Sequence, residues 1–294
     1  MTGPAVVAVG GGHGQAASLR AVRRFTADIT AVVSVADDGG SSGRLRQQLG
    51  IVPPGDLRKC LVALADPGSP LARAFDHRFE GELDALGDEL PGHALGNLVI
   101  AGLVTTTGDV QLALDEAARL LGCVGRVVPA AAEPVVLKAE ADGGEIEGQT
   151  AVAGTAHIRR VSLVPADPPA SPEAVAAVAA AEMVVIGPGS LFTSVLAAVA
   201  VPELGEAIRR TSARRVYVAN LHTQPAETEG FDVAAHVEAL ERHDIPIDVV
   251  LADTAAIARG DLTGRVVEVA LARPDGGPGH DPVRLAAALA GLVG

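Results

Sequence analysis

Short runs of β-branched residues alternate along the chain with longer segments rich in alanine and leucine. The first run, Ala5–Val9, is followed by a helical pattern over Gln15–Phe25 and by a second run at Ile29–Val35. Apolar strands separated by helical segments are typical of a parallel sheet that is covered on both faces. The pattern therefore predicts an α/β protein with a Rossmann-like, mainly parallel sheet flanked by helices.

The same alternation continues to the end of the chain. It predicts helices at 57–65, 93–105, 110–121, 172–181, 191–198, 202–210 and 283–292, and strands at 183–186, 215–219, 248–252 and 266–270. Asp56, Asp109 and Asp281 precede three of these helices and are expected to cap their free amides.

Between Arg126 and Val164 the pattern changes to short extended segments around the turn Ala141–Gly144. Charged and apolar residues alternate there, which predicts an antiparallel β excursion inserted into the α/β core. The connecting loops elsewhere are too short to be domain linkers. Residues 1–294 are therefore expected to form a single Rossmann-like domain.

Composition narrows the classes of function. The chain has 36 acidic and 23 basic residues and a formal charge of −13, so we expect no nucleic-acid partner, because such binding needs clustered cations. Cys60 and Cys123 belong to no metal or disulfide motif. The longest apolar stretch, Ala174–Ile186, is shorter than the about 20 residues that cross a bilayer. We therefore expect a cytoplasmic protein with no membrane partner.

A glycine-rich turn joins the first predicted strand to the first helix. Because glycine has no Cβ atom, the backbone of such a turn can approach a phosphate that the helix amino terminus stabilises. No Gly-Lys-Ser/Thr follows, so this is not a Walker loop, but a loose dinucleotide fingerprint is satisfied. A turn needed only for close strand-helix packing is the alternative. The residues are Gly10, Gly11, Gly12, His13 and Gly14.

The second predicted strand ends in an acidic loop rich in glycine and serine. The carboxyl ends of parallel strands bind ligands in open α/β sheets. Its carboxylates can accept bonds from sugar hydroxyls or hold Mg²⁺, while its hydroxyls and amides surround an anion. A solvated turn is the alternative. The residues are Asp37, Asp38, Gly39, Gly40, Ser41, Ser42, Gly43 and Arg44.

Four more segments place polar groups beside glycines or predicted strand ends. Two of them open helices, where caps or ion pairs would explain the residues equally well. The third repeats the strand, glycine turn and helix of the first loop and is a second anion-site candidate with free amides. The fourth supplies amides and hydroxyls that can bind a base or a sugar. The residues are Gly55, Asp56 and Arg58; His93 and Asn97; Gly187, Pro188, Gly189, Ser190 and Thr193; and Asn220, Thr223 and Gln224.

Together these motifs resemble the bacterial gluconeogenesis factor family, of the YvcK type, which is related to the CofD-type 2-phospho-L-lactate transferases. The resemblance covers nearly the whole chain, and the acidic glycine-serine loop and the Gly-Pro-Gly-Ser loop carry most of it. The family's first loop usually reads Gly-Gly-Gly-Thr-Gly, so His13 replaces a hydroxyl by a titratable ring. The matching segments are Gly10–Gly14, Val35–Arg46, Pro54–Arg58, Gly96–Leu98, Gly187–Val195 and Asn220–Pro225.

The resemblance implies a dimeric regulator that binds UDP-sugars such as UDP-N-acetylglucosamine and is needed for cell shape on gluconeogenic carbon sources. It implies no assigned catalytic residue and no required cofactor. The alternative is a transferase of a phospholactyl-type group, with Mg²⁺ on Asp37 and Asp38. A nicotinamide oxidoreductase is a third hypothesis. It rests on the loose glycine fingerprint and the acidic residue after the second strand, and it lacks a hydride-transfer partner.

Overall fold

A parallel sheet of seven strands forms the centre of the computed structural model, which describes residues 3–79 and 90–293. The strand order is β10-β9-β8-β7-β1-β2-β3, and β1 pairs in parallel with both β2 and β7. The predicted Rossmann-like sheet is thus confirmed. Its strands are β1 (Val6–Gly10), β2 (Ile29–Val33), β3 (Arg126–Pro129), β7 (Met183–Ile186), β8 (Arg214–Val218), β9 (Val249–Ala252) and β10 (Val266–Glu268).

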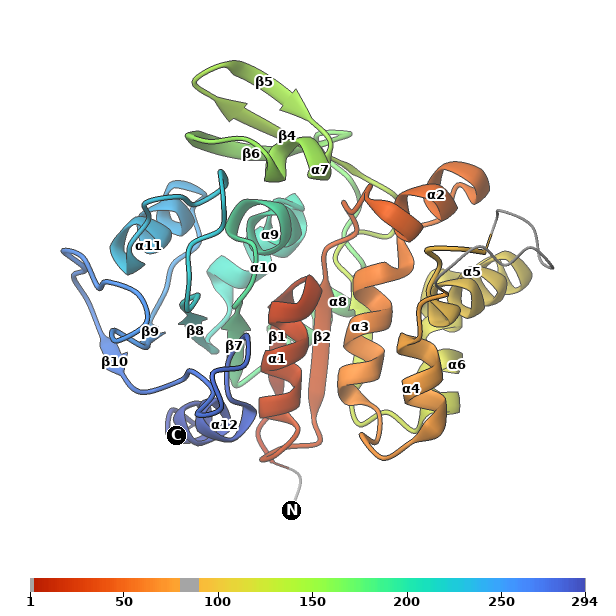
Figure 1. The fold of residues 1–294 in the computed structure, drawn as a ribbon, viewed down its shortest axis with the longest axis horizontal. Coiled ribbons are helices and arrows are strands. Elements are labelled where there is room, and N and C mark those ends of the chain that lie inside the picture. The colour runs from red at the N-terminus through yellow and green to blue at the C-terminus, as the bar shows by residue number, and fades with distance from the viewer. Residues whose placement is uncertain (1–2, 80–89, 294) are drawn as a thin grey trace.

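Helices cover both faces of this sheet, which explains why β1, β7 and β9 are buried along their whole length. One layer, nearest the viewer in Figure 1, contains α1 (Gly12–Val22), α3 (Pro54–Leu64) and α12 (Pro282–Ala290). The layer behind the sheet contains α8 (Pro172–Ala180), α9 (Ala197–Val199) and α10 (Pro202–Arg210). β2 and β3 lie on one side of β1, and β7 lies on its other side. The sheet therefore has a topological switch point between β1 and β7.

A second sheet lies across the carboxyl ends of the parallel strands, at the top of Figure 1. It is antiparallel, with the order β5-β4-β6, and consists of β4 (Val136–Ala141), β5 (Gly144–Glu147) and β6 (Ile158–Val164). The short helix α7 (Gln149–Ala153) connects β5 to β6. The predicted excursion is therefore confirmed from β4 onward. Its predicted first segment is wrong, because β3 pairs in parallel with β2 in the main sheet, where Val127 and Val128 are buried.

Four helices were not predicted from the pattern: α2 (Gly40–Leu49), α4 (Pro70–Asp76), α7 and α11 (Val233–Arg242). The remaining helices are α5 (Leu95–Thr107), α6 (Val110–Leu121) and a π-helical turn, η1 (Leu191–Leu196), that runs into α9. The second part of the acidic glycine-serine loop, from Gly40 onward, is the start of α2. Gly50 caps the carboxyl end of this helix with a φ of +69°, which favours glycine.

Two of the three predicted caps are confirmed, since Asp109 accepts a bond from Leu112 N and Asp281 accepts bonds from Val283 N and Arg284 N. The predicted cap at Asp56 is wrong. α3 begins at Pro54, three residues before the predicted start, and proline suits the first helical position because its missing N–H is not needed there. Asp56 therefore lies inside the first turn.

One hydrophobic cluster includes residues of both sheets, among them Val32 and Val185 of the main sheet and Leu137 and Leu163 of the small one. In the described part of the chain, no single helix is both long and apolar enough to cross a membrane. Among the same described residues, one bent pair, Leu191–Val199 and Pro202–Arg210 with 80° between its helices, passes by length and composition when its two helices are taken together.

Candidate functional site

A polar pocket of about 310 Å³ lies at the switch point of the sheet. Loops after β1, β2 and β7 form it together with the start of α3, while Gln149 of α7 reaches it from the small sheet. Ligands of doubly wound folds bind at this position. The predicted site residues that line this pocket are Gly11, Gly12, His13, Gly14, Asp37, Asp56, Gly189, Ser190 and Gln224.

The amino terminus of α1 borders this pocket without a side-chain cap. Gly11 precedes the helix, and the first turn contains no acidic residue. The first amides of a helix have no partner within the helix, and the helix dipole places partial positive charge there. Gly12 has a φ of +65°, which favours glycine. This end of the helix is therefore suited to an anion.

Gly14 lets α1 approach the loop that follows β7. A Cβ atom at Gly14 would lie 2.2 Å from the carbonyl oxygen of Pro188 and 2.6 Å from the Cα atom of Gly189. Both obstacles are backbone atoms, so no side-chain rotation could relieve the contact. Glycine is required here because two glycine loops meet.

Asp37, Asp56 and Lys59 place charges along one wall of the pocket. Lys59 Nζ lies 2.9 Å from Asp56 Oδ1, and this pair is mostly buried. Burial raises the pKa of Asp37, and the neighbouring carboxylate of Asp56 raises it further. Two carboxylates that repel each other in this way suit a divalent cation shared with phosphate oxygens. Within residues 3–79 and 90–293, no group of three or more His, Cys, Asp or Glu side chains is placed to hold a metal.

His13 lines both the polar pocket and a larger hollow beside it. Burial lowers the pKa of its ring, and the positive charge of Lys59 lowers it further. The neutral imidazole is thereby favoured near pH 7, and it can still donate one hydrogen bond.

A second hollow of about 670 Å³ continues from the polar pocket, because both are lined by His13, Gly14, Gly189 and Gln224. The structure also brings the predicted residues Pro188, Asn220 and Thr223 to this hollow. Its other polar or charged lining residues are Arg20, His222, Arg273 and His280. The two hollows form one groove across the switch point, in the size range of pockets for nucleotide-like ligands.

The amides at the end of the predicted second anion site, Gly187–Thr193, are not free, although Gly189 and Ser190 line the polar pocket. The buried side chain of Glu227 binds two of these amides: Oε1 accepts bonds from Phe192 N at 2.7 Å and Thr193 N at 3.2 Å, and Oε2 accepts one from Thr193 Oγ1 at 3.0 Å. Glu227 is only 3% exposed, and burial raises the pKa of its carboxyl. An internal carboxyl group thus binds the amides of Phe192 and Thr193, where a ligand was expected.

Asn220 and Gln224 hold the loop after β7 in place. The Asn220 side chain accepts a bond from Gly189 N and donates one to Gly189 O, at 2.9 and 2.8 Å. Gln224 Nε2 donates to Ser190 Oγ at 2.6 Å. The Asn220 amide therefore positions Gly189, whereas the sequence predicts that it binds a base or a sugar.

The expected Mg²⁺ pair of Asp37 and Asp38 is not assembled. Asp38 Oδ1 accepts hydrogen bonds from Thr150 N at 2.9 Å and Thr150 Oγ1 at 2.7 Å, so it fastens α7 to the acidic loop. The carboxylate that accompanies Asp37 in the pocket is Asp56. Successive side chains of a loop diverge, which the sequence alone does not reveal.

Ser41, His93 and Asn97 form a buried polar group between α2 and α5. Ser41 Oγ lies 2.9 Å from His93 Nδ1 and accepts a bond of 2.9 Å from Asn97 Nδ2. His93 and Asn97 therefore share one face, as their spacing predicts. None of the three lines the polar pocket or the hollow beside it.

Both predicted arginines bind protein groups. Arg44 donates to Pro91 O at 2.9 Å, and Arg58 is buried and pairs with Asp76. Ser42, Gly43 and Gly55 serve close packing around the acidic loop: a Cβ at Gly43 would lie 2.0 Å from Asp38 O, and one at Gly55 would lie 2.2 Å from Ser42 Oγ. Gly39 and Gly40 start α2. These residues support the site from outside it.

Lys59, Gln149 and Ser194 line the polar pocket but were not among the predicted site residues. Lys59 has a local signal, since it follows Asp56 at the i, i+3 spacing of helix ion pairs. Gln149 and Ser194 have none, because the small sheet and η1 bring them to the pocket from distant parts of the chain.

His280 makes a testable contribution to stability. Its Nε2 lies 3.0 Å from Ala219 O, and burial lowers its pKa to about 4. The unfolded chain binds a proton near pH 6.5, whereas the folded chain does not until about pH 4, so stability falls as the pH drops through this window. We expect wild type to lose about 2 kcal/mol more than His280→Gln between pH 7 and pH 5 in urea unfolding. Equal losses would show that the His280 pKa is unshifted.

Known proteins resemble this chain over most of its length. Residues 6–270 match the family model "2-phospho-L-lactate transferase CofD". A relative from Mycobacterium tuberculosis is 47% identical over 98% of this chain and 90% of its own length. The gluconeogenesis factor of Bacillus subtilis is 41% identical over 92% of this chain and 84% of its own.

A crystal structure of a UPF0052 family member from Bacillus halodurans has the same fold. It superposes with a TM-score of 0.91 at 34% identity and covers 99% of both chains. The family match, the near full-length relatives and this shared fold agree with one another. The chain belongs to the CofD family, and within it to the group of proteins named gluconeogenesis factor.

Proposed function

We propose that this protein is a cytoplasmic, homodimeric regulator that binds a UDP-sugar such as UDP-N-acetylglucosamine in the groove at the switch point. In this role it supports cell shape during growth on gluconeogenic carbon sources. The observation that carries the proposal is the uncapped amino terminus of α1, which borders a pocket that also contains Lys59. A diphosphate fits the free amides together with the ammonium group of Lys59, which also pairs with Asp56.

The rest of the groove offers complementary chemistry for the other parts of such a ligand. Asp37, Asp56 and Gln149 provide oxygen atoms that accept bonds from sugar hydroxyls. The larger hollow contains Leu221, Pro278 and the exposed Thr223, which suit the apolar face and polar edge of a base. Among the described residues, 3–79 and 90–293, no serine, cysteine or histidine of the groove has the partners of an activated nucleophile, which favours binding without catalysis.

Isothermal titration with UDP-N-acetylglucosamine tests the proposal. The chain has two lysines, so Lys138→Met, which removes the other lysine, is a matched control for Lys59→Met. We expect saturable binding that Lys59→Met weakens at least about tenfold and Lys138→Met leaves unchanged, since Lys138 pairs with Glu145 on the small sheet. The ligand should be recovered intact. No binding, or equal effects of both variants, would contradict the proposal.

The transferase hypothesis has one specific observation in its favour, the neighbouring carboxylates of Asp37 and Asp56. These residues would hold Mg²⁺ together with phosphate oxygens, and the metal would offset charge on a transferring group. The hypothesis requires Mg²⁺-dependent consumption of a nucleotide-activated phospholactate donor, and Asp37→Asn should abolish it. An intact donor after incubation with Mg²⁺ and a deazaflavin acceptor would exclude this activity.

A further inference from the structure

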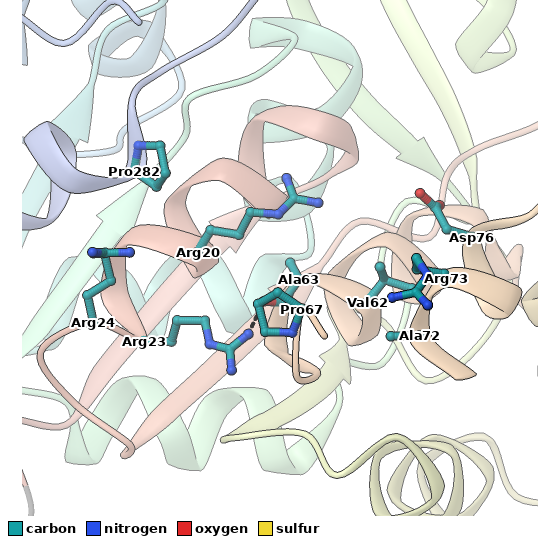
Figure 2. A pocket seen from close by; sticks show the side chains of 10 residues that line it. All are labelled: Arg20, Arg23, Arg24, Val62, Ala63, Pro67, Ala72, Arg73, Asp76 and Pro282. Carbon is teal, nitrogen blue, oxygen red and sulfur yellow. Dashed lines mark hydrogen bonds between the residues drawn. The ribbon is translucent and has the colours of Figure 1, made fainter. Parts of the chain in front are cut away.

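Away from the polar pocket, a hollow of about 710 Å³ lies between α1 and the pair α3 and α4. Figure 2 shows Arg20, Arg23 and Arg24 along its α1 side and Arg73 with Asp76 on its α4 side. Apolar side chains of α3 lie between the two sides. Two helices thus direct guanidinium groups toward one space.

The charge around this hollow opposes that of the chain as a whole, which is −13. Four arginines line it with a single carboxylate, Asp76, and that carboxylate already pairs with Arg58. Arg23 donates to the carbonyl oxygens of Ala63 and Ala65 at the end of α3.

Arg20 and Arg24 differ from Arg23 in this respect. Within residues 3–79 and 90–293, neither of their guanidinium groups has a hydrogen-bond or ion-pair partner. The hollow therefore contains unneutralised positive charge.

The helix dipole accounts for part of this arrangement, because cations near the carboxyl end of α1 are favourable. It does not account for Arg73, which comes from a different helix, donates one hydrogen bond through Nη1 to Gly68 O at 3.1 Å and faces the same space. Arginines that converge on a bounded hollow repel one another unless an anion is present. The planar fork of arginine matches the oxygen atoms of phosphate, and guanidinium groups on opposite sides suit a ligand with separated charges.

We propose that this hollow is an effector site for a small molecule carrying two or more phosphate groups, bound by Arg20, Arg24 and Arg73. A bounded hollow favours a small ligand, since a nucleic acid would require a basic stripe along the surface. Arg20 also lines the larger hollow of the nucleotide groove, so the two sites adjoin along α1. This inference does not depend on which nucleotide the groove binds.

Isothermal titration with sodium pyrophosphate at low ionic strength tests the effector site. The double variant Arg24→Ala with Arg73→Ala removes two exposed side chains that line this hollow and not the nucleotide groove. We expect its pyrophosphate affinity to fall at least about tenfold, while Arg265→Ala, which removes an exposed arginine elsewhere, keeps wild-type affinity.

Two results would overturn the effector site. One is an unchanged affinity in the double variant whose melting temperature matches wild type. The other is a loss of pyrophosphate binding in Lys59→Met alone, because that would place the anion in the nucleotide pocket. The double variant should titrate normally with UDP-N-acetylglucosamine, so a failure of the nucleotide proposal is seen separately.

Discussion

Gly14→Ala is expected to lower the free energy of unfolding by about 3 kcal/mol and to weaken UDP-N-acetylglucosamine binding at least tenfold. The added methyl carbon would lie 2.2 Å from the Pro188 carbonyl oxygen, so the loops after β1 and β7 must move apart. This separation would displace the amides of α1 from the pocket. Urea unfolding and titration with the nucleotide measure the two effects.

Gly102→Ala is the matched control. Gly102 lies inside α5, is exposed, and has nothing within 4 Å of the position of an added Cβ. Alanine there should raise stability by about 0.5–1 kcal/mol, because glycine is a poor helix former. If Gly14→Ala were as stable as wild type, the close approach of the two loops would not exist in solution.

Glu227→Ala is expected to lower the free energy of unfolding by about 3 kcal/mol or more. The substitution leaves two buried amides and the hydroxyl of Thr193 without their partner, and each unsatisfied buried group costs about 1–3 kcal/mol. Glu227→Gln should cost less, because its amide oxygen can still accept from the backbone and its NH₂ group can donate to Thr193 Oγ1.

Urea unfolding of both variants beside Glu229→Ala measures this contribution. Glu229 is exposed, so its loss should change stability by less than about 0.5 kcal/mol. A stability of Glu227→Ala equal to that of Glu229→Ala would mean that the turn after β7 does not depend on an internal anion.

The parallel sheet could be predicted because its central strands are short apolar runs that are buried on both faces. Met183–Ile186 is predicted without error for this reason. α2 could not be predicted in the same way. Its first residues are Gly40, Ser41, Ser42 and Gly43, all poor helix formers, and contacts such as the burial of Leu45 outweigh that weak propensity.

The candidate site could be predicted only in part from the sequence. Glycine turns at strand ends mark the first loop reliably, because backbone conformation there is a local property. Whether an amide is free is a tertiary property: Glu227 reaches the amide of Phe192 from 35 residues away. Asp38 likewise accepts a hydrogen bond from Thr150, which lies 112 residues further along the chain, and this bond holds Asp38 outside the pocket. The same local motif thus has a different role at α1 and at η1.

A crystal structure with UDP-N-acetylglucosamine tests the central claim most directly. We predict density for the diphosphate within about 3 Å of the amides of Gly12, His13 and Gly14, beside Lys59 and with Glu227 still bound to η1. Diphosphate density at the amides of Phe192 and Thr193 with Glu227 displaced, or no ligand density in the groove at saturating concentration, would contradict it.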